Sequence, residues 1–460
     1  MSRPKRSGAA RPAYRPVPLA DPRRVAYDLL RAVAERSAYA NLTLPGMLKE
    51  RGVSERDRGL ATELGYGTLR AQGTLDAVLA ACLDRPLDAV DGPVLDLLRL
   101  GAYQLLRTRV PTHAAVATSV ELARSVLTHG QVGFVNAVLR KASARDEAGW
   151  LALVAPPLEQ DPAAHLAQKH AHPGWIVRAY RDALGDWDQT ARALAADDER
   201  PQVHLVARPG RIDREELATD AGGTPGPWSP YAVHLSGGDP GRIAAVRDGR
   251  AGVQDEGSQL AVLALTGTPL DGPDRCWLDL CAGPGGKAAL LGALAAQQDA
   301  DVLAVELQPH RAALVQQATA GLPVRTLVAD GRQLAETGFD RVLVDAPCTG
   351  LGALRRRPEA RWRRQPSDVA PLAKLQRELL TAALAAARPG GLVAYVTCSP
   401  HLMETRAVVA DVLRRTGAVA VDTRPALAGV PELGDAPEVQ LWPHRQGTDA
   451  MFVALLRAPG

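Results

Sequence analysis

Between residues 21 and 143, apolar side chains recur every three or four positions, which is the spacing of amphipathic helices. Asp21 followed by Pro22 is typical of a helix start, because the carboxylate caps the first turn and proline needs no hydrogen-bond partner there. Ser54, with Asp57 three positions later, gives a second start that resembles a capping box. We therefore predict an all-α bundle in this part of the chain.

From Gly252 onward the pattern changes to short apolar stretches that alternate with alanine-rich helical segments. This alternation predicts βαβ units and a mainly parallel sheet. The predicted strands are, in chain order, CWLDLCAG, DVLAVEL, VRTLVAD, DRVLVDAP and GLVAYVTC, with AVAVDTRP and MFVALLRA completing the sheet. Between the two regions the chain is rich in Gly, Pro and Asp, and RPQVHLVARPGRIDREEL predicts a strand followed by a helix.

A chain of 460 residues is longer than one hydrophobic core normally supports. We predict a disordered basic tail over 1–20, a helical domain over 21–145, a linking α/β subdomain over 146–250 and an α/β domain over 251–460. The tail has enough basic residues to touch phosphates, and a tail without a role is an equal alternative.

Composition limits the possible functions. The net charge of +3 argues against a non-specific polyanion binder, so local basic clusters matter more than the total. The five cysteines contain no CxxC pair, which fits a reducing cytoplasm and gives no metal-ligand spacing. No apolar stretch is long enough for a membrane span or a signal peptide. We expect a cytoplasmic protein without a membrane-embedded part or a bound metal.

The carboxyl ends of the first four predicted strands carry a glycine loop or an acid. They are Gly283, Glu306, Asp330 and Asp345. Ligands of open α/β sheets bind outside these strand ends. Although a single acid there could be a helix cap, a series at successive ends favours a ligand site.

The glycine loop CAGPGGK connects the first of these strands to a helix. Its residues are Cys281, Ala282, Gly283, Pro284, Gly285, Gly286 and Lys287. A phosphate-binding P-loop is excluded because Ala288 follows the lysine, and the glycine spacing excludes the dinucleotide fingerprint. Glu306 lies 306 − 286 = 20 residues past the last glycine, the distance at which an acid binds ribose hydroxyls. The loop therefore favours an adenosyl ligand that carries a carboxylate, such as S-adenosylmethionine.

Two cysteines follow the fourth and fifth predicted strands. Cys348 stands in DAPCTGLG and Cys398 in TCSP. Adjacent parallel strands bring their carboxyl ends together, so we expect both thiols to face one cleft beside the cofactor. Chance packing of two small apolar side chains is the alternative. It explains neither the Pro-Cys and Thr-Cys placements nor the nearby Asp345.

The motifs resemble two known families. LGYGTLR, LRLGAYQLL, PTHAAVATSVELAR and FVNAVLRK resemble the NusB type of RNA-binding helical fold. QDEGSQL, DLCAGPGGK, VLVDAPCTGLGALRRRPEARW, YVTCS and PHRQGTDAMFVALLR resemble bacterial RNA cytosine-5 methyltransferases. Together they make nearly everything after residue 20 similar to 16S ribosomal RNA methyltransferases of the RsmB type.

The resemblance implies a fold and an activity. The fold would be a Rossmann-like class I methyltransferase domain preceded by a NusB-like bundle and a small α/β linker domain. The activity would be methyl transfer from S-adenosylmethionine to carbon 5 of a cytosine in 16S ribosomal RNA, through a covalent cysteine–cytosine intermediate. The implied partner is small-subunit RNA, naked or partly assembled, bound by a monomer.

The resemblance also implies roles for single residues. Cys398 would be the nucleophile, Cys348 would assist product release and Asp345 would act beside them. The loop 281–287, Glu306, Asp330 and Asp345 would hold S-adenosylmethionine.

The sequence departs from the family pattern in several places. Gly283 stands where Ala is usual, Glu306 where Asp is common and Thr349 where Ser is usual. HLMETR replaces a more acidic pattern after Cys398, which leaves Glu404 without an implied role.

A basic segment, RRRPEARWRR, follows the Pro-Cys motif. We predict that Arg355, Arg356 and Arg361 bind RNA phosphates and that Trp362 packs or stacks on a base. A solvated basic loop without a ligand is the alternative.

Two other functions remain open. One is a transfer RNA cytosine-5 methyltransferase of the same family, because the catalytic motifs do not encode the target. The other is a non-catalytic RNA-binding ribosome assembly factor, against which the intact Cys348, Cys398 and glycine loop argue.

Overall fold

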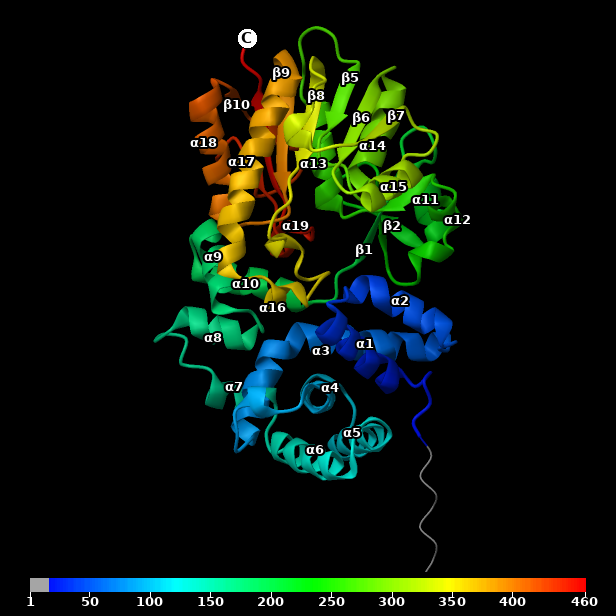
Figure 1. Cartoon of the computed structure of the whole chain (residues 1–460), viewed down its shortest axis with the longest axis vertical. Helices are drawn as coiled ribbons and strands as arrows, with labels where there is room; N and C mark the ends of the chain where they lie inside the picture. Colours follow the sequence, from blue (N-terminus) through cyan, green and yellow to red (C-terminus); the bar gives the residue numbers. More distant parts are fainter. Residues whose placement is uncertain (1–15) are drawn as a thin grey trace, which may run out of the picture. The chain divides into compact units, whose positions relative to one another are not determined.

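The computed structural model describes residues 16–460, which form two compact units (Figure 1). The first unit ends at Ala171 and the second runs from His172 to Gly460. Most of the predicted basic tail lies outside the described residues. Its last part lies against the helical unit, where the Val17 N–H donates to Ser125 Oγ at 2.8 Å.

The first unit is entirely helical, as the apolar spacing predicts. Its α-helices are α1 Pro22–Arg36, α2 Ala40–Glu50, α3 Glu55–Cys82, α4 Gly92–Arg107, α5 Thr112–Val126, α6 His129–Ala142, α7 Glu147–Val154 and α8 Pro162–Lys169. Their apolar faces meet in one core, with Leu29, Leu64, Leu75, Leu97 and Leu98 fully buried. Burial of such side chains against one another is the main stabilising contribution to a bundle.

The two helix starts are where the caps predict them. The Asp21 carboxylate accepts hydrogen bonds from the N–H groups of Arg23 and Arg24, which are otherwise unpaired at the start of α1. Ser54 Oγ likewise accepts from the Asp57 N–H at 3.2 Å at the start of α3.

The second unit begins with two helices and a small antiparallel sheet. The helices are α9 Gly174–Leu184 and α10 Trp187–Asp198. The sheet has the order β2-β3-β1-β4, formed by β1 Val203–Ala207, β2 Gly223–Pro225, β3 Ala232–Leu235 and β4 Ala251–Val253, with α11 Arg214–Ala221 and α12 Ala244–Arg247 beside it. The segment 146–250 is therefore not a unit of its own: α7 and α8 belong with the helical bundle, and the rest belongs with the second unit.

A larger sheet dominates the second unit. Its order is β10-β12-β9-β8-β5-β6-β7, and β11 pairs with β12. The strands are β5 Cys276–Asp279, β6 Asp301–Glu306, β7 Val324–Val328, β8 Phe339–Asp345, β9 Ala387–Thr397, β10 Val419–Val421, β11 Val439–Gln440 and β12 Phe452–Arg457. The five strands from β5 to β9 run parallel, and β12 pairs antiparallel with β9. All seven predicted strands are confirmed.

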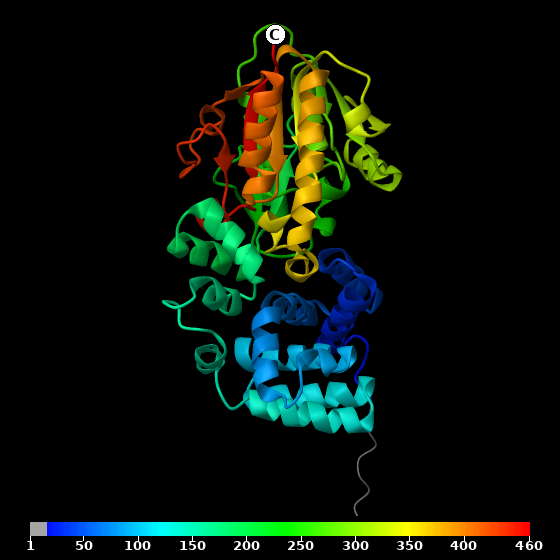
Figure 2. The same ribbon diagram turned by 60° about the vertical axis from the view of Figure 1, so that its left-hand side comes forward.

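Helices cover both faces of this sheet. On one face lie α13 Glu256–Gly267, α14 Gly286–Gln297 and α15 Pro309–Ala318; on the other lie α17 Val369–Ala386 and α18 Arg406–Thr416, which run side by side in Figure 2. Successive residues of β8 alternate between these layers: Leu343 packs with α13 and α14, and Val342 and Val344 pack with α17 and α18. Burial on both faces explains why the strands are continuously apolar.

The remaining helices are short. They are α16 Ala360–Arg363, α19 Pro443–Gln446 and the 3-10 turns η1 Leu87–Ala89, η2 Pro240–Arg242, η3 Gly331–Gln333, η4 Leu351–Ala353, η5 Pro366–Asp368, η6 Leu402–Glu404 and η7 Arg424–Leu427. From residue 16 to the C-terminus, no helix has both the length and the apolar character needed to cross a membrane.

Candidate active site

The candidate site lies at the carboxyl ends of β5, β6, β8 and β9, where ligands of open α/β sheets bind. Cys281, Lys287, Asp345, Cys348 and Cys398 are all partly exposed there, although the strands that lead to them are buried. Because β9 and β5 both pair with β8, the topology brings the two cysteine motifs and the glycine loop to one edge.

The glycine loop turns β5 into α14 through backbone that a side chain would obstruct. Gly285 has φ +109° and precedes the first turn of α14, a conformation that favours glycine. A Cβ on Gly283 would lie 2.1 Å from Glu306 Oε2. The helix N-terminus offers N–H groups to an anionic ligand, and a Cβ at Gly286 would meet no atom within 4 Å. These features fit the carboxylate of an amino-acid-like ligand.

Glu306 ends β6 and lies directly against this loop. Its carboxylate accepts the Gly283 N–H at 3.0 Å and the Gln308 N–H at 2.9 Å, and Arg311 lies 3.7 Å away. Each oxygen keeps a further lone pair, so these bonds leave capacity for ribose hydroxyls. The longer Glu side chain occupies the space that an alanine at 283 would need, which links two departures from the family pattern.

Asp330 lies past the end of β7 and is tied to a neighbouring residue. Both carboxylate oxygens bind Arg332, with the shortest contact at 2.6 Å, and these bonds lower the pKa of Asp330. Its role as a cofactor ligand stays a prediction.

Asp279 was missed by the sequence reasoning. It is the last residue of β5, fully buried, and its Oδ2 has no hydrogen-bond partner among residues 16–460. Burial and the nearby charge of Asp345 raise its pKa to about 7. The available signal was an acid in an otherwise apolar strand, directly before the glycine loop.

Lys287 connects the glycine loop to the Pro-Cys motif. Its Nζ lies 2.8 Å from Asp345 Oδ2. Burial lowers the pKa of Lys287, but the charge and hydrogen bond of Asp345, together with the nearby Cys398 and Asp279, outweigh burial and raise it overall. A paired ammonium group therefore stays charged beside the two thiols.

The two cysteines are brought together as the strand order predicts. Cys348 Sγ and Cys398 Sγ lie 3.5 Å apart. A hydrogen bond from the Cys348 thiol, assisted by the Lys287 charge, lowers the pKa of Cys398 against the opposing effects of burial and Asp345. The same bond, together with burial, raises the pKa of Cys348. The pair therefore favours a thiolate on Cys398 and a thiol on Cys348.

The predicted phosphate-binding residues have a different environment. Arg355 binds Asp449 and Asp255 at 2.8 and 3.1 Å, and Arg356 binds the same two carboxylates at 2.9 and 2.7 Å. Arg361 is fully buried, with Asp198 at 2.9 Å.

Arg355 and Arg361 are buried in ion pairs, and their predicted contact with RNA phosphates stays a prediction. Acids far away in the sequence occupy their guanidinium groups, so an RNA phosphate would have to displace a buried ion-pair partner, which is costly. Arg356 keeps 23% of its side chain exposed but has the same acidic partners. Trp362 is half-buried, so stacking on a base stays a prediction.

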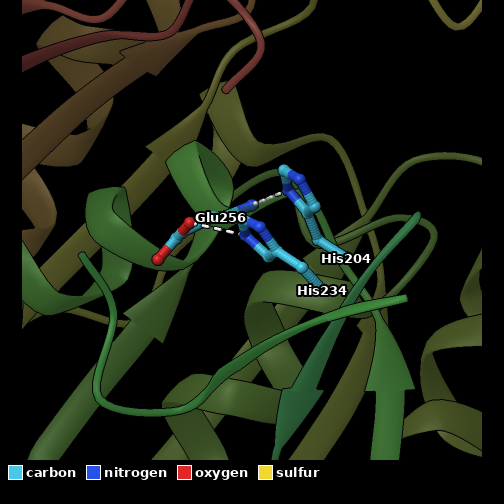
Figure 3. Close-up of side chains that lie close together, drawn as sticks. All are labelled: His204, His234 and Glu256. Carbon is cyan, nitrogen blue, oxygen red and sulfur yellow. Dashed lines mark hydrogen bonds and ion pairs between the residues drawn. The ribbon is translucent and has the colours of Figure 1, made fainter. Parts of the chain in front are cut away.

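Figure 3 shows a second polar cluster, formed by His204 of β1, His234 of β3 and Glu256 of α13. Their possible ligand atoms lie within 4.8 Å of one another. These atoms already have protein partners: Glu256 Oε1 accepts the Trp228 and Ser229 N–H groups, Oε2 lies 2.8 Å from His234 Nε2, and His204 Nδ1 accepts the Glu256 N–H. The cluster joins the small sheet to α13 as a structural element.

Family models match both units. The model described as 16S rRNA methyltransferase RsmB/F matches residues 268–457, and that of the NusB family matches residues 20–144. These matches confirm the predicted NusB-like bundle and Rossmann-like methyltransferase domain.

Curated relatives match over nearly the whole chain. A protein of Mycobacterium tuberculosis strain H37Rv, provisionally named a methyltransferase, is 60% identical over 443 residues, which are 96% of this chain and 97% of that protein. The ribosomal RNA small subunit methyltransferase B of Salmonella arizonae is 33% identical over 446 residues, which are 94% of this chain and 98% of that protein.

Solved structures show the same fold. The structure of PH0851 has a TM-score of 0.77 at 21% identity and covers 96% of this chain and 99% of its own. The structure of NSun6 from Pyrococcus horikoshii with SFG has a TM-score of 0.53 at 17% identity and covers 63% of this chain and 98% of its own.

Proposed function

Because the chain belongs to the 16S rRNA methyltransferase RsmB/F family, we propose that it methylates carbon 5 of a cytosine in 16S ribosomal RNA. Membership makes it an S-adenosylmethionine-dependent rRNA methyltransferase; the base position and the covalent route are the proposal. The observation that carries both is the thiol pair, 3.5 Å apart, beside the glycine loop.

The chemistry of cytosine requires a nucleophile of this kind. Carbon 5 is too weakly nucleophilic to take a methyl group unaided, whereas a thiolate that adds to carbon 6 makes carbon 5 enamine-like. Cys398 is the proposed attacker, because its pKa is lowered and the Lys287 charge lies near. S-adenosylmethionine, when bound, supplies the methyl group as a sulfonium.

The reaction then has to release the product. A base removes the carbon 5 proton, the bond between Cys398 and carbon 6 breaks, and the thiolate leaves. Cys348, whose Sγ lies 3.5 Å from that of Cys398, is the proposed assistant in this step. The target base must leave its stack to enter the site.

The cofactor site rests on several residues together. The loop 281–287 would bind the amino-acid part of S-adenosylmethionine at the start of α14. Glu306 would bind its ribose, and Asp330 would lie beside its adenine base. Asp345 holds Lys287 and would stay close to the target ring.

The helical unit is the proposed RNA-holding part, because it belongs to the NusB family and carries none of the catalytic motifs. A chain that begins at His172 should still bind S-adenosylmethionine but bind RNA more weakly. Equal RNA affinity with and without the helical unit, at matched salt, would contradict this. The cytoplasmic location and the monomeric state stay predictions.

Bisulfite mapping of total RNA, with and without this protein, tests the proposed function. We expect one cytosine of 16S ribosomal RNA to resist bisulfite conversion when the protein is present and to be converted when it is absent. Protection lost from a transfer RNA would establish the alternative substrate. Failure to bind S-adenosylmethionine in a calorimetric titration would favour the non-catalytic assembly factor.

A further inference from the structure

We propose that Glu404 is a positioning residue that holds the Pro-Cys and Thr-Cys loops together and makes Cys398, and not Cys348, the nucleophile. That Cys398 acts as a nucleophile rests on the proposed function. The difference between the two thiols can be measured without RNA.

Glu404 lies in η6, six residues after Cys398, and is fully buried. Its Oε1 accepts the Thr349 N–H at 2.8 Å and the Gln376 side-chain N–H at 3.2 Å. Its Oε2 accepts the hydroxyl groups of Ser399, at 2.7 Å, and Thr349. One carboxylate therefore binds the residue that follows each cysteine.

Four hydrogen-bond donors surround this fully buried carboxylate. A buried charge is costly unless hydrogen bonds compensate it, and here each oxygen has two. The Tyr395 hydroxyl also donates to the Glu404 carbonyl at 2.6 Å, which fixes the backbone of η6. The charge is thus held in one place relative to both thiols.

The charges around the thiol pair are asymmetric. Glu404 binds the residue after each cysteine, but both the N–H and the hydroxyl of Thr349 donate to it, and its charge adds to the rise in the pKa of Cys348, after the Cys398 hydrogen bond and burial. The Lys287 charge acts in the other direction on Cys398. Asp345 raises the pKa of both thiols, and at Cys398 its effect exceeds that of Lys287, so the hydrogen bond between the thiols and the Glu404 charge set the difference between them.

The rival interpretation is that Glu404 only holds the loops. Other contacts also do this, since the Gly352 N–H donates to the Cys398 carbonyl at 2.9 Å. Glu404→Gln separates the two interpretations. The amide oxygen can replace Oε1, and the amide N–H₂ can donate to the two hydroxyls in place of Oε2, so the variant loses the charge and keeps the contacts.

The experiment measures alkylation of each cysteine by iodoacetamide against pH, by mass spectrometry of peptides from the full-length protein. In the unmodified protein we expect Cys398 to react at lower pH than Cys348. In Glu404→Gln we expect the rate ratio between them to fall about tenfold, the effect of one pKa unit. Glu216→Gln, which removes an exposed acid on α11, is the matched control and should leave the ratio unchanged.

Two outcomes would overturn the inference. One is an unchanged rate ratio in a folded Glu404→Gln protein. The other is an equal fall of the ratio in Thr349→Val and in Glu404→Gln. Thr349→Val replaces only the hydroxyl group that binds Glu404, so loop position and not charge would then account for the effect. A shifted ratio in a protein that modifies no cytosine would refute the proposed function and leave the effect on the thiols standing.

Discussion

Two neighbouring segments of the second unit, 345–349 and 355–364, both carry residues that the sequence marks as functional. In the first, Asp345 and Cys348 are partly exposed at the carboxyl edge of the sheet. In the second, Arg355 and Arg361 are buried against acids from residues 198, 255 and 449. The position of the first segment follows from strand order. Whether the arginines of the second segment are buried or exposed depends on which acidic residues the fold brings to them. Residue type alone does not predict this.

Removing each thiol in turn tests the role of the first segment most directly. Cys398→Ala should lose more than about a thousandfold in methylation rate and form no covalent species, because no other group replaces a nucleophile. Cys348→Ala should attack, transfer methyl and then stall. A denaturing gel with labelled RNA and cofactor should show a slow-migrating adduct.

The double variant should lose that adduct. An adduct with Cys398→Ala but not with Cys348→Ala would reverse the assignment. Two active variants without an adduct would support chance packing.

For the second segment, Arg361→Ala should lower the free energy of unfolding by about 3 kcal/mol or more, because it leaves Asp198 and the Asp197 carbonyl without their buried partner. Arg357→Ala, at an exposed position nearby, should change it by less than about 0.5 kcal/mol. Urea titration measures both. If Arg361→Ala left the stability unchanged and lowered the slope of RNA affinity against salt concentration by about one phosphate contact, Arg361 would be a phosphate ligand.

Asp279 offers a pH test of the catalytic edge. Its pKa is raised from 3.8 to about 7, so the folded protein keeps this proton over a range in which the unfolded chain has lost it. The bound proton of Asp279 therefore stabilises the folded protein. This contribution to the free energy of unfolding is complete below pH 3.8, the pKa in the unfolded chain, and is lost as the pH rises through about 7. It amounts to roughly 4 kcal/mol at about 1.4 kcal/mol per pKa unit, as an order of magnitude.

Asp279→Asn should therefore flatten the decline in unfolding free energy between pH 4 and pH 7. Asp301→Asn, at the exposed start of β6, should leave the decline as it is. An equal slope in Asp279→Asn and the unmodified protein would exclude Asp279 as its source.

The smallest expected effect concerns the fit between Gly283 and Glu306. Glu306→Ala should weaken S-adenosylmethionine binding at least tenfold, consistent with loss of a charged hydrogen bond of about 1.5–3 kcal/mol. Gly283→Ala should also weaken it, because the new Cβ would lie 2.1 Å from Glu306 Oε2. Combining Gly283→Ala with Glu306→Asp should recover most of the affinity, since the shorter acid vacates that space.

Calorimetric titration of the single and double variants gives the coupling energy. Circular dichroism checks that each variant is folded. Additive losses would show that the two positions act independently.

Most of the secondary structure elements could be predicted from the sequence. Caps at Asp21 and Ser54 fixed helix starts by local hydrogen bonds, and continuous apolar runs marked strands buried on both faces. The meeting of Cys348 and Cys398 was also predictable, because parallel strands share one carboxyl edge. These inferences use local hydrogen bonding or topology, both of which short stretches of sequence express.

The partners of the charged groups depend on the tertiary fold, and local sequence does not predict them. Arg361 and Asp198 lie 163 positions apart, and Glu404 joins two loops whose approach no local pattern encodes. A buried charge is stable only where the fold brings compensating donors or acceptors to it. For the same reason Asp279 looked like one polar residue in a strand. Its raised pKa arises from burial and from Asp345, 66 residues later on the adjacent strand.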